Sequence, residues 1–576
     1  MYKRLRLLSI AIIISSGIGA QSAYPKSYFR NPLGIPMDLS ANFGELRSNH
    51  WHMGLDIRTN QKENLAVYAA AQGYISHIGI RPQSFGRFII ITHPNGLSTL
   101  YAHLNDFYPE LEKYVIDEQY KKESWAIELD ITKDQFPVTK GQFIAYSGNT
   151  GGSQGPHLHF EIFDTKSEKR LNPLLFDFPL KDNVRPNLVR LAVYDRSRSV
   201  YDQTPSFLAV KNTDSGYFLT KSSIYQTGAN KISFAIQAYD RLSGSNNPNG
   251  IYSAKLIVDG ESQISFVLDS IDYEESVFMN AHIDYKFDHN GGAYIQHLSR
   301  MPGDKGSVYH PQGKDGIIHL GDTLIHTVSI DVKDAYGNTS VLNFSLQFSD
   351  SLAALKKKGL SQLRMLAPNE VHEFEKKDFE MLIGEGCLYD SVPTTYISGN
   401  AVDVNSFSAS HQFNDPSFPV HNDVLVRIKA TKSIPANLED KLLIQRTLKG
   451  STIRKAVKDG DWYTASFGDF GIYRLVADIL PPQINDPGKG DTINLSKSKR
   501  IVFSPKDNYG MVKKFRAELN GQWLRFTNDK TRNWIYTFDE RCPDGVHFLK
   551  VVVEDHAGNI TEKSWWFRRV TAPGKK

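Results

Sequence analysis

The chain has 576 residues, and its 67 lysine and arginine residues nearly balance 63 aspartate and glutamate residues. No basic stripe stands out along the chain, so we expect no nucleic-acid partner. Because roughly 100 to 200 residues form a typical domain, the length predicts several domains rather than one.

Residues 1–23 are predicted to be a signal peptide. Three basic residues precede the apolar stretch Leu7 to Ala20, which is shorter than the roughly 18 residues expected of a spanning helix. Cleavage after Ala20 or Ala23 would leave no later run long enough to span a bilayer, whereas an uncleaved anchor is the alternative. We therefore expect an exported, soluble mature protein in the periplasm or cell envelope, or outside the cell.

The first motif is Asn49-His50-Trp51-His52-Met53-Gly54-Leu55-Asp56. In an extended segment, His52 and Asp56 point to the same side, and Gly54 between them has no side chain to obstruct a shared ligand. These two donors could therefore converge. His50 could face the same cleft, where we expect it to support a ligand or to contact substrate.

A third histidine follows the turn Pro94-Asn95-Gly96, after which the sequence alternates as a strand would. Alternation places Thr99, Tyr101 and His103 on one face. The chain has no H-E-x-x-H helix to supply a glutamate base, so a histidine would have to handle the proton of a nucleophilic water.

The charged segment Pro109 to Asp130 contains Leu111, Tyr114 and Val115 at helical spacing. It predicts a helix beside the groove that holds the histidines. Such a helix could restrict which substrates enter or act as a movable cover. The alternative is a solvated flap without a role.

The glycine-rich residues 148–155 are predicted to be a turn, since they lack a Gly-Lys-Ser/Thr ending and lead into a strand. The strand is Pro156-His157-Leu158-His159-Phe160-Glu161-Ile162. Alternation sends His157, His159 and Glu161 to one face and the apolar residues to the core. Glu161 could orient a histidine or lie in solvent at the groove edge.

A catalytic zinc ion needs three protein ligands and one open position. His52, Asp56 and one histidine of the 157/159 pair supply that number. Nitrogen and oxygen donors without thiolate suit zinc, and manganese or cobalt would also be accepted. We expect one zinc ion per chain, with His103 and the remaining histidine of the pair handling protons.

The segments His52-Met53-Gly54-Leu55-Asp56, Tyr101-Ala102-His103-Leu104 and Gly155-Pro156-His157-Leu158-His159-Phe160-Glu161-Ile162 occur in this order. Together they resemble the lysostaphin/LytM-type zinc metalloendopeptidases, which cut the peptide part of peptidoglycan. The resemblance covers about residues 40 to 165. It implies that His52, Asp56 and His159 are zinc ligands and that His103 and His157 are catalytic.

The resemblance implies an enzyme that hydrolyses the peptide cross-links of bacterial peptidoglycan through a zinc-activated water and two catalytic histidines. Its partners would be peptidoglycan stem peptides. The alternative is a non-catalytic regulator or scaffold that binds peptidoglycan and recruits another cell-wall hydrolase. All five matching residues are present, which favours the enzyme.

The fold class is predicted to be mainly β: an antiparallel-sheet zinc peptidase core followed by immunoglobulin-like β-sandwich modules. We expect the peptidase at 24–180 and an Ig-like module at 186–350, with an insertion around 270–316. A linker helix and a β-rich domain follow at 351–478. A C-terminal Ig-like module is expected at 480–570, after Pro481-Pro482.

The two Ig-like modules show an internal echo. Asp334-Ala335-Tyr336-Gly337-Asn338 resembles Asp555-His556-Ala557-Gly558-Asn559, and Asp240 parallels Asp507 upstream. The modules could bind glycan or a protein partner, or space the catalytic domain. Cys387 and Cys542 could form a disulfide or remain two buried free thiols.

Overall fold

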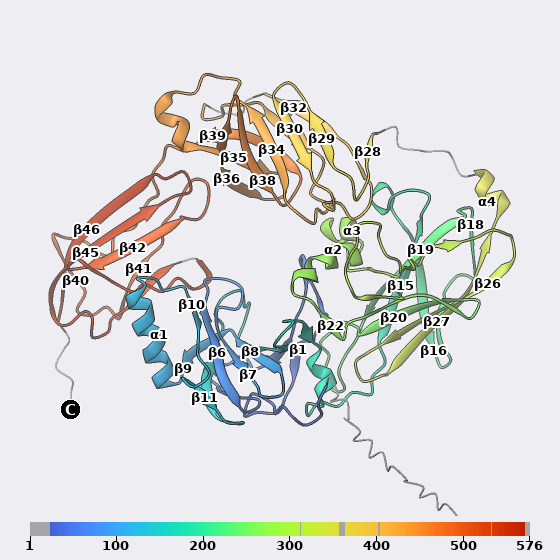
Figure 1. Ribbon diagram of the computed structural model, residues 1–576, viewed down its shortest axis with the longest axis horizontal. Coiled ribbons are helices and arrows are strands. Elements are labelled where there is room, and N and C mark those ends of the chain that lie inside the picture. The colour runs from blue at the N-terminus through green and yellow to red at the C-terminus, as the bar shows by residue number, and fades with distance from the viewer. Residues whose placement is uncertain (1–23, 312, 356–362, 401–403, 532, 571–576) are drawn as a thin grey trace, which may run out of the picture.

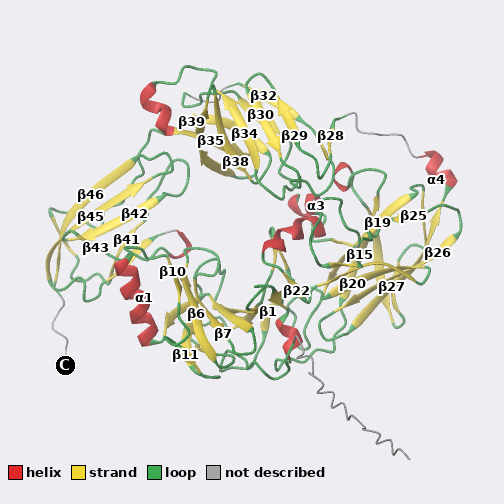
Figure 2. Ribbon diagram, viewed as in Figure 1, coloured by secondary structure: helices red, strands yellow, loops and turns green. Residues whose placement is uncertain are grey.

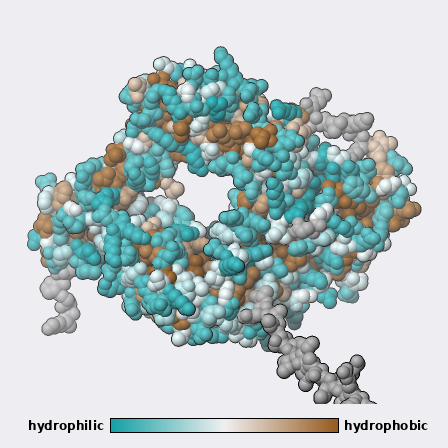
Figure 3. Space-filling model, viewed as in Figure 1, coloured by the Kyte–Doolittle hydropathy of each residue, from teal (hydrophilic) through white to brown (hydrophobic). Residues whose placement is uncertain are grey.

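The structure is a computed structural model that describes residues 24–311, 313–355, 363–400, 404–531 and 533–570. The predicted signal peptide at 1–23 lies outside the described residues. Four β-rich units follow one another around a ring, and the last unit returns to the first (Figure 1). The space-filling view shows an opening through the middle of the ring (Figure 3). Strands dominate every unit (Figure 2), so the predicted mainly β class is confirmed.

The first unit contains an antiparallel sheet in which β13 lies between β4 and β8. Leu158, Phe160 and Ile162 of β13 are fully buried in its core, as the alternating sequence predicted. The sheet order is β1 (Leu39–Ala41), β4 (Leu55–Arg58), β13 (His157–Asp164), β8 (Leu97–Ala102), β7 (Arg87–Thr92), β6 (Gly73–Ile80) and β10 (Ile127–Asp130). Short strands β11 (Pro137–Val138) and β14 (Arg170–Leu171) join this sheet, and β5 (Ala66–Tyr68), β12 (Phe143–Ser147) and β9 (Leu104–Phe107) form a second one.

The second unit is a twelve-stranded sheet whose two halves face each other across one core. Phe234 of β19 and Phe344 of β27 pack edge to face, with ring centroids 5.4 Å apart. Its long strands are β15 (Asn187–Asp195), β16 (Ser206–Thr213), β19 (Lys231–Tyr239), β20 (Ser253–Val258), β21 (Glu261–Val267), β26 (Ile325–Lys333) and β27 (Thr339–Phe348), with β17 (Gly216–Leu219) and β18 (Ile224–Thr227) beside β27.

The expected insertion in this unit lies against the first unit. The backbone N–H of Trp51 donates to Ser276 Oγ at 3.2 Å, and β22 pairs with β14. The insertion contains β22 (Ser270–Ile271), helix α2 (Met279–His282), helix α3 (Tyr285–His289), β23 (Gln296–His297) and β24 (Tyr309–His310), and β25 (Ile318–His319) follows it.

The third unit follows helix α4 (Asp350–Leu355) and consists mainly of two five-stranded antiparallel sheets. One sheet has the order β29 (His372–Glu375), β30 (Phe379–Ile383), β34 (Val424–Lys429), β38 (Trp462–Phe467) and β37 (Val457–Asp459). The other has the order β32 (Tyr396–Gly399), β33 (Ser410–Phe413), β39 (Gly471–Ala477), β35 (Leu442–Thr447) and β36 (Ser451–Lys455).

The fourth unit is a small sandwich with its own core. Phe503, Val551 and Phe567 are fully buried there. Its larger sheet has the order β40 (Thr492–Asn494), β46 (Ile560–Arg569), β45 (Gly545–Glu554), β42 (Lys514–Leu519) and β43 (Gln522–Trp523), and β41 (Arg500–Phe503) pairs with β44 (Trp534–Thr537).

Helix α1 (Pro109–Lys121) forms where the sequence predicted a helix, but the predicted position beside the groove is wrong. Leu111 and Val115 are buried against the first unit, so the outer face of the helix is left to meet the fourth unit. There Tyr120 packs edge to face on Trp523 at 5.2 Å, and Arg525 donates to Gln119 at 2.9 Å. The helix therefore closes the ring (Figure 1).

The two cysteines are buried and free, so the structure supports the alternative of two free thiols. Cys387 lies in the third unit and Cys542 in the fourth. Within the described ranges, every helix is too short or too polar to cross a lipid bilayer.

Candidate active site

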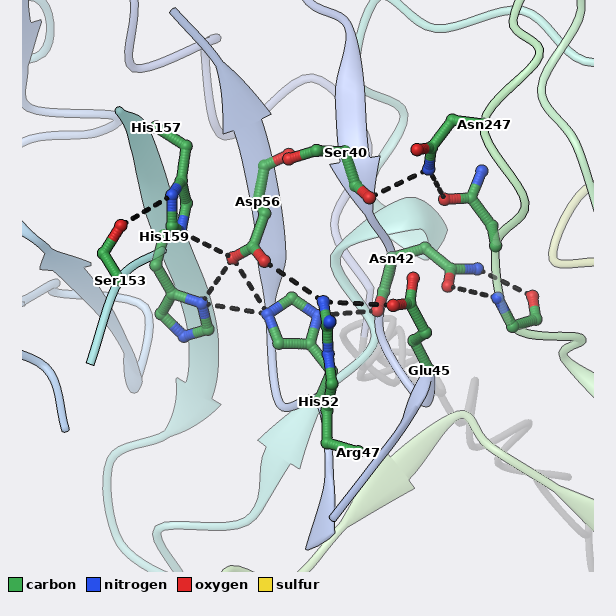
Figure 4. A network of polar contacts seen from close by, with 12 residues as sticks. Ser40, Asn42, Glu45, Arg47, His52, Asp56, Ser153, His157, His159 and Asn247 are labelled. Carbon is green, nitrogen blue, oxygen red and sulfur yellow. Dashed lines mark hydrogen bonds and ion pairs between the residues drawn. The ribbon is translucent and has the colours of Figure 1, made fainter. Parts of the chain in front are cut away.

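Three of the predicted site residues converge at one end of β13. Asp56 lies opposite His159 in the β4 and β13 pairing. His52 Nε2 and His159 Nδ1 each lie 2.9 Å from Asp56 Oδ1, and the two nitrogens are 3.0 Å apart (Figure 4). The structure thus brings together the three residues that the resemblance implied as metal ligands.

The backbone reaches this arrangement differently from what the sequence suggested. Strand β3 (His50–Trp51) ends before His52, and β4 begins only at Leu55, so His52 lies in a connection rather than in one extended segment with Asp56. A Cβ atom on Gly54 would lie 2.4 Å from the Phe160 carbonyl oxygen. This glycine therefore permits the close approach of β13 and does not serve to clear space for a ligand.

Hydrogen bonds on the outer nitrogens fix how both histidines present their inner nitrogens. The Nδ1–H of His52 donates to the Asn42 carbonyl at 2.7 Å, and the Nε2–H of His159 donates to Glu161 at 2.9 Å. The inner nitrogens are then left with lone pairs, directed at a carboxylate oxygen. Three electron-rich atoms this close together require a cation or a proton between them, so the donor set fits a divalent metal.

The raised pKa of His159 also indicates that this site favours a positive charge. Burial lowers its pKa, but hydrogen bonds to Asp56 and Glu161 outweigh burial and raise the pKa to about 9. The site therefore favours positive charge at neutral pH even inside the protein.

Glu161 is fully buried and holds the outer side of His159. Its other oxygen accepts a hydrogen bond from Arg170 Nε at 2.9 Å. Burial raises the pKa of Glu161, but His159 and the Arg170 guanidinium lower it below its usual value overall. Of the two roles left open by the sequence, the structure places Glu161 in the supporting one.

His103 and His157 lie side by side next to the three donors, with ring centroids 4.7 Å apart. Their Nδ1–H groups donate to the carbonyl oxygens of Thr150 and Gly155, each at 2.8 Å. His157 Nε2 lies 3.4 Å from Asp56 Oδ1. All five predicted site residues are therefore neighbours.

The position of His103 does not follow from strand alternation. Strand β8 ends at Ala102, and His103 has a left-handed backbone with φ of 59° before β9 begins. Burial lowers the pKa of His103 to about 3, and the neighbouring His157 and His159 contribute in the same direction. His103 therefore stays neutral at physiological pH.

The five residues open into a groove of about 1450 Å³. The first unit forms most of its wall, and the insertion of the second unit adds Tyr273, Ser276 and Tyr294. Sequence reasoning missed these three because nothing local in the chain connects them to site residues more than 100 positions earlier. His50 lines the groove, bonds the Ser48 carbonyl at 2.9 Å and is exposed.

Arg47 and Glu45 are two further groove residues that the sequence did not indicate. Arg47 lies beside His52 (Figure 4), with Nη2 3.0 Å from Glu45 Oε1 and 3.5 Å from Asp56 Oδ2, the carboxylate oxygen that the histidines do not contact. Arg47 therefore balances charge at the second oxygen of Asp56.

The fourth unit contacts the turn at residues 148–155. This turn supplies the carbonyl groups of Thr150 and Gly155, which accept hydrogen bonds from His103 and His157. The Gly151 N–H donates to Asp529 Oδ1 at 2.7 Å, and Lys530 Nζ donates to the Ser153 carbonyl. The Lys530 N–H also donates to the Pro82 carbonyl at 2.8 Å. Contacts from a distant part of the chain thus support the hydrogen bonds of His103 and His157.

Comparison with known families assigns three parts of the chain. The model of peptidase family M23 matches residues 50–120 and 115–173, which include all five site residues. The N-terminal region is a peptidase M23 domain. A Zu5-like domain model matches residues 363–478, and a bacterial Ig-like domain model matches residues 481–568.

The curated relatives match only part of this chain. The DD-carboxypeptidase/endopeptidase Mpg of Neisseria meningitidis is 34% identical over 110 residues, which is 19% of each chain. The cell division protein DipM of Caulobacter vibrioides is 27% identical over 152 residues, covering 26% of this chain and 19% of that protein. The matches thus span about a fifth of these relatives.

Among solved structures, the catalytic domain of lysostaphin from Staphylococcus simulans is 22% identical. It covers 23% of this chain and 86% of that domain, with a TM-score of 0.18.

Proposed function

We propose that this protein is an exported zinc endopeptidase that hydrolyses the peptide cross-links of bacterial peptidoglycan. The observation that carries the proposal is the convergence of two histidine lone pairs and one carboxylate oxygen beside two further histidines in an open groove. The M23 match and a relative named as a DD-carboxypeptidase/endopeptidase support the reaction and the substrate class. The predicted signal peptide at 1–23 supports export.

His52, Asp56 and His159 would hold one zinc ion through atoms that already face one another. When bound there, zinc lowers the pKa of a water molecule toward about 7 and polarises a peptide carbonyl. Glu161 and Asn42 keep the ligand rings in place through their outer nitrogens. Asp56 is the third ligand, and the Arg47 guanidinium partly balances its negative charge.

His157 is suited to accept the proton of the attacking water. Its Nδ1–H is engaged with the Gly155 carbonyl, so Nε2 carries the lone pair, and this atom lies 3.4 Å from the carboxylate of Asp56. The Nε2–H formed in this step can then be donated to the departing amine.

His103 is suited to orient the water rather than to carry charge. It donates Nδ1–H to Thr150 and stays neutral because its pKa is lowered to about 3. Its Nε2 lone pair can therefore accept a hydrogen bond from the attacking water throughout the reaction. This division of roles was left open by the sequence.

The decisive experiment incubates the chain from residue 24 onward with purified peptidoglycan sacculi, in zinc and after chelation. We expect new free amino groups and shorter cross-linked fragments by mass spectrometry, which disappear with the chelator and return with added zinc. His157→Ala should lose 10²-fold or more in turnover while still binding zinc.

His77→Ala is the matched control, because His77 pairs with Glu128 and Asp130 outside the groove. It should retain full turnover. Tight binding to sacculi without any bond cleavage in zinc would contradict the proposal and support the alternative of a scaffold that recruits another hydrolase.

A further inference from the structure

The sequence echo between the second and fourth units folds into the same loop twice. In each loop an aspartate and an asparagine four positions later bind each other through backbone and side chain. Asp334 Oδ1 accepts from the Asn338 N–H at 2.9 Å, and Asp555 Oδ1 accepts from the Asn559 N–H at 2.8 Å. The asparagine amide also donates to the other aspartate oxygen, at 2.6 Å and 2.8 Å respectively. The repeat is therefore structural as well as sequential.

Each loop also binds the connector by which the chain enters the unit. The Asn338 amide donates to the Asp182 carbonyl at 3.3 Å. The Asn559 amide donates to the Asp478 carbonyl at 2.9 Å. Asp182 precedes β15, and Asp478 follows β39 just before the fourth unit. The same aspartate, asparagine and connector arrangement thus occurs at the entrance of both units.

In the first acidic cluster, Asp182, Asp240 and Asp334 each bring a carboxylate oxygen within 4.8 Å of the others. Asp240 follows β19, and its side chain is 3% exposed. Its Oδ1 and Asp182 Oδ2 are buried and accept no hydrogen bond. Two electron-rich atoms in this cluster therefore lack the partner that burial normally demands.

In the second acidic cluster, Asp478, Asp507 and Asp555 meet the same 4.8 Å limit. Asp478 is 1% exposed, and its Oδ2 is buried without a hydrogen-bond partner. Asp507 Oδ1 is also buried without a hydrogen-bond partner. The unsatisfied oxygens thus recur at corresponding places in two units that differ in most of their sequence.

In both acidic clusters, burial makes some of the carboxylates harder to ionise. Burial raises the pKa of Asp240 to about 7, with the Asp334 charge as the next contribution. Burial likewise raises the pKa of Asp478 and of Asp507. Within the described residues, none of the six carboxylates forms an ion pair with lysine or arginine.

We propose that each acidic cluster binds one Ca²⁺ ion. Calcium takes six to eight oxygen ligands in flexible geometry, and carboxylates with nearby carbonyl and amide oxygens provide such donors. Zinc prefers nitrogen or sulfur donors, which both clusters lack, and magnesium requires a stricter octahedron and keeps several waters. The proposal is independent of the chemistry in the groove.

The ion would join the connector to the body of the unit it precedes. Asp182 and Asp478 belong to connectors, while the other four aspartates belong to loops of the second and fourth units. Calcium would therefore fix the angle at which each unit leaves its predecessor. Because the fourth unit closes the ring on the first, calcium would also stiffen the contact at residues 148–155.

The test uses the chain from residue 24 onward, stripped with EGTA and then supplied with one equivalent of zinc. Calorimetric titration with CaCl₂ should show two sites per chain. Asp240→Asn and Asp507→Asn should each leave one site, and the double variant should leave none. Asp134→Asn, at an exposed turn outside both clusters, is the matched control and should keep two.

Terbium luminescence gives a second readout on folded protein. Tyr336 N–H donates to Asp334 and Tyr509 N–H donates to Asp507, both at 2.9 Å, so each cluster has a tyrosine to sensitise Tb³⁺ excited near 280 nm. Calcium should quench this emission by displacement, and each single variant should lose about half of it. Unchanged calcium stoichiometry in the double variant, or no calcium binding by the parent protein, would overturn the proposal.

Discussion

Three side chains offer metal-ligand atoms in the groove of the first unit, and three do so in each acidic cluster of the second and fourth units. The chemistry of these atoms differs between the groove and the clusters. In the groove, two imidazole nitrogens and one carboxylate oxygen meet beside two further histidines in open space. In each acidic cluster, three carboxylates meet where a connector joins the unit that it precedes. The first arrangement suits a metal that acts on a substrate, and the second suits one that holds domains together.

Substitution of a groove ligand should have the largest effect and should separate the two kinds of site. His159→Ala removes one of three donors and leaves Glu161 and Asp56 without their shared partner. We expect loss of stoichiometric zinc and a fall of at least about 10³-fold in kcat/KM on sacculi. Asp240→Asn should keep zinc and turnover. Calcium titration of His159→Ala should still show two sites, and activity within tenfold of the parent would contradict the ligand assignment.

Acid should destabilise the insertion of the second unit, because this insertion contains a buried histidine that lies outside the groove. His282 in α2 is 0% exposed and lies between Tyr309 and Gln296, and burial lowers its pKa to about 4. The unfolded chain takes up a proton near pH 6.5, so the stabilisation is complete above that pH and is lost as the pH falls toward 4. The expected loss at pH 5 is roughly 2 kcal/mol.

Hydrogen exchange of peptides covering residues 279–298 at pH 7 and pH 5, corrected for intrinsic rates, would measure this loss. In His282→Gln, the number of protons taken up on unfolding should be smaller by about one. In His77→Gln, this number should be unchanged. Equal pH dependence in the parent and in His282→Gln would show that another group controls acid sensitivity in the insertion.

Loosening the contact between the fourth unit and the groove should have the smallest of these effects. Asp529→Ala removes the acceptor of the Gly151 N–H but touches no zinc ligand. We expect turnover to fall a few-fold to about tenfold, with zinc affinity and KM nearly unchanged, because His103 and His157 lose support for their backbone acceptors. Asp491→Ala, at an exposed position of the same unit, is the control. A loss of zinc in Asp529→Ala would contradict this reasoning.

Much of the groove could be read from the sequence because its donors lie in short motifs with regular spacing. Alternation at 156–162 correctly placed His159 and Glu161 on one face and Leu158 on the other. The same rule failed for His52 and His103, since each lies where a strand has just ended and the backbone turns. Local periodicity cannot show such breaks, because backbone contacts elsewhere in the sheet decide them.

Helix α1 and the acidic clusters show that sequence patterns do not reveal which distant residues an element contacts. Helical spacing predicted α1, but its partner Trp523 lies about 400 residues later in the chain. The aspartates at 334 and 555 were visible as an echo, yet their role depends on Asp182 and Asp478, which no motif connects to them. Sequence periodicity reports which face of an element is apolar, and it does not report what covers that face.

The sequence by itself determined the mainly β class, a helix within residues 109–130 and the five site residues that meet in the groove, because hydrophobic alternation and motif spacing are local properties. Only the tertiary structure decided the supporting role of Glu161, the contribution of Tyr273 and Tyr294 to the groove, and the closure of the ring by the fourth unit. Those features arise from contacts between residues up to several hundred positions apart. Such contacts are selected by burial and charge in the folded chain and leave no local pattern in the sequence.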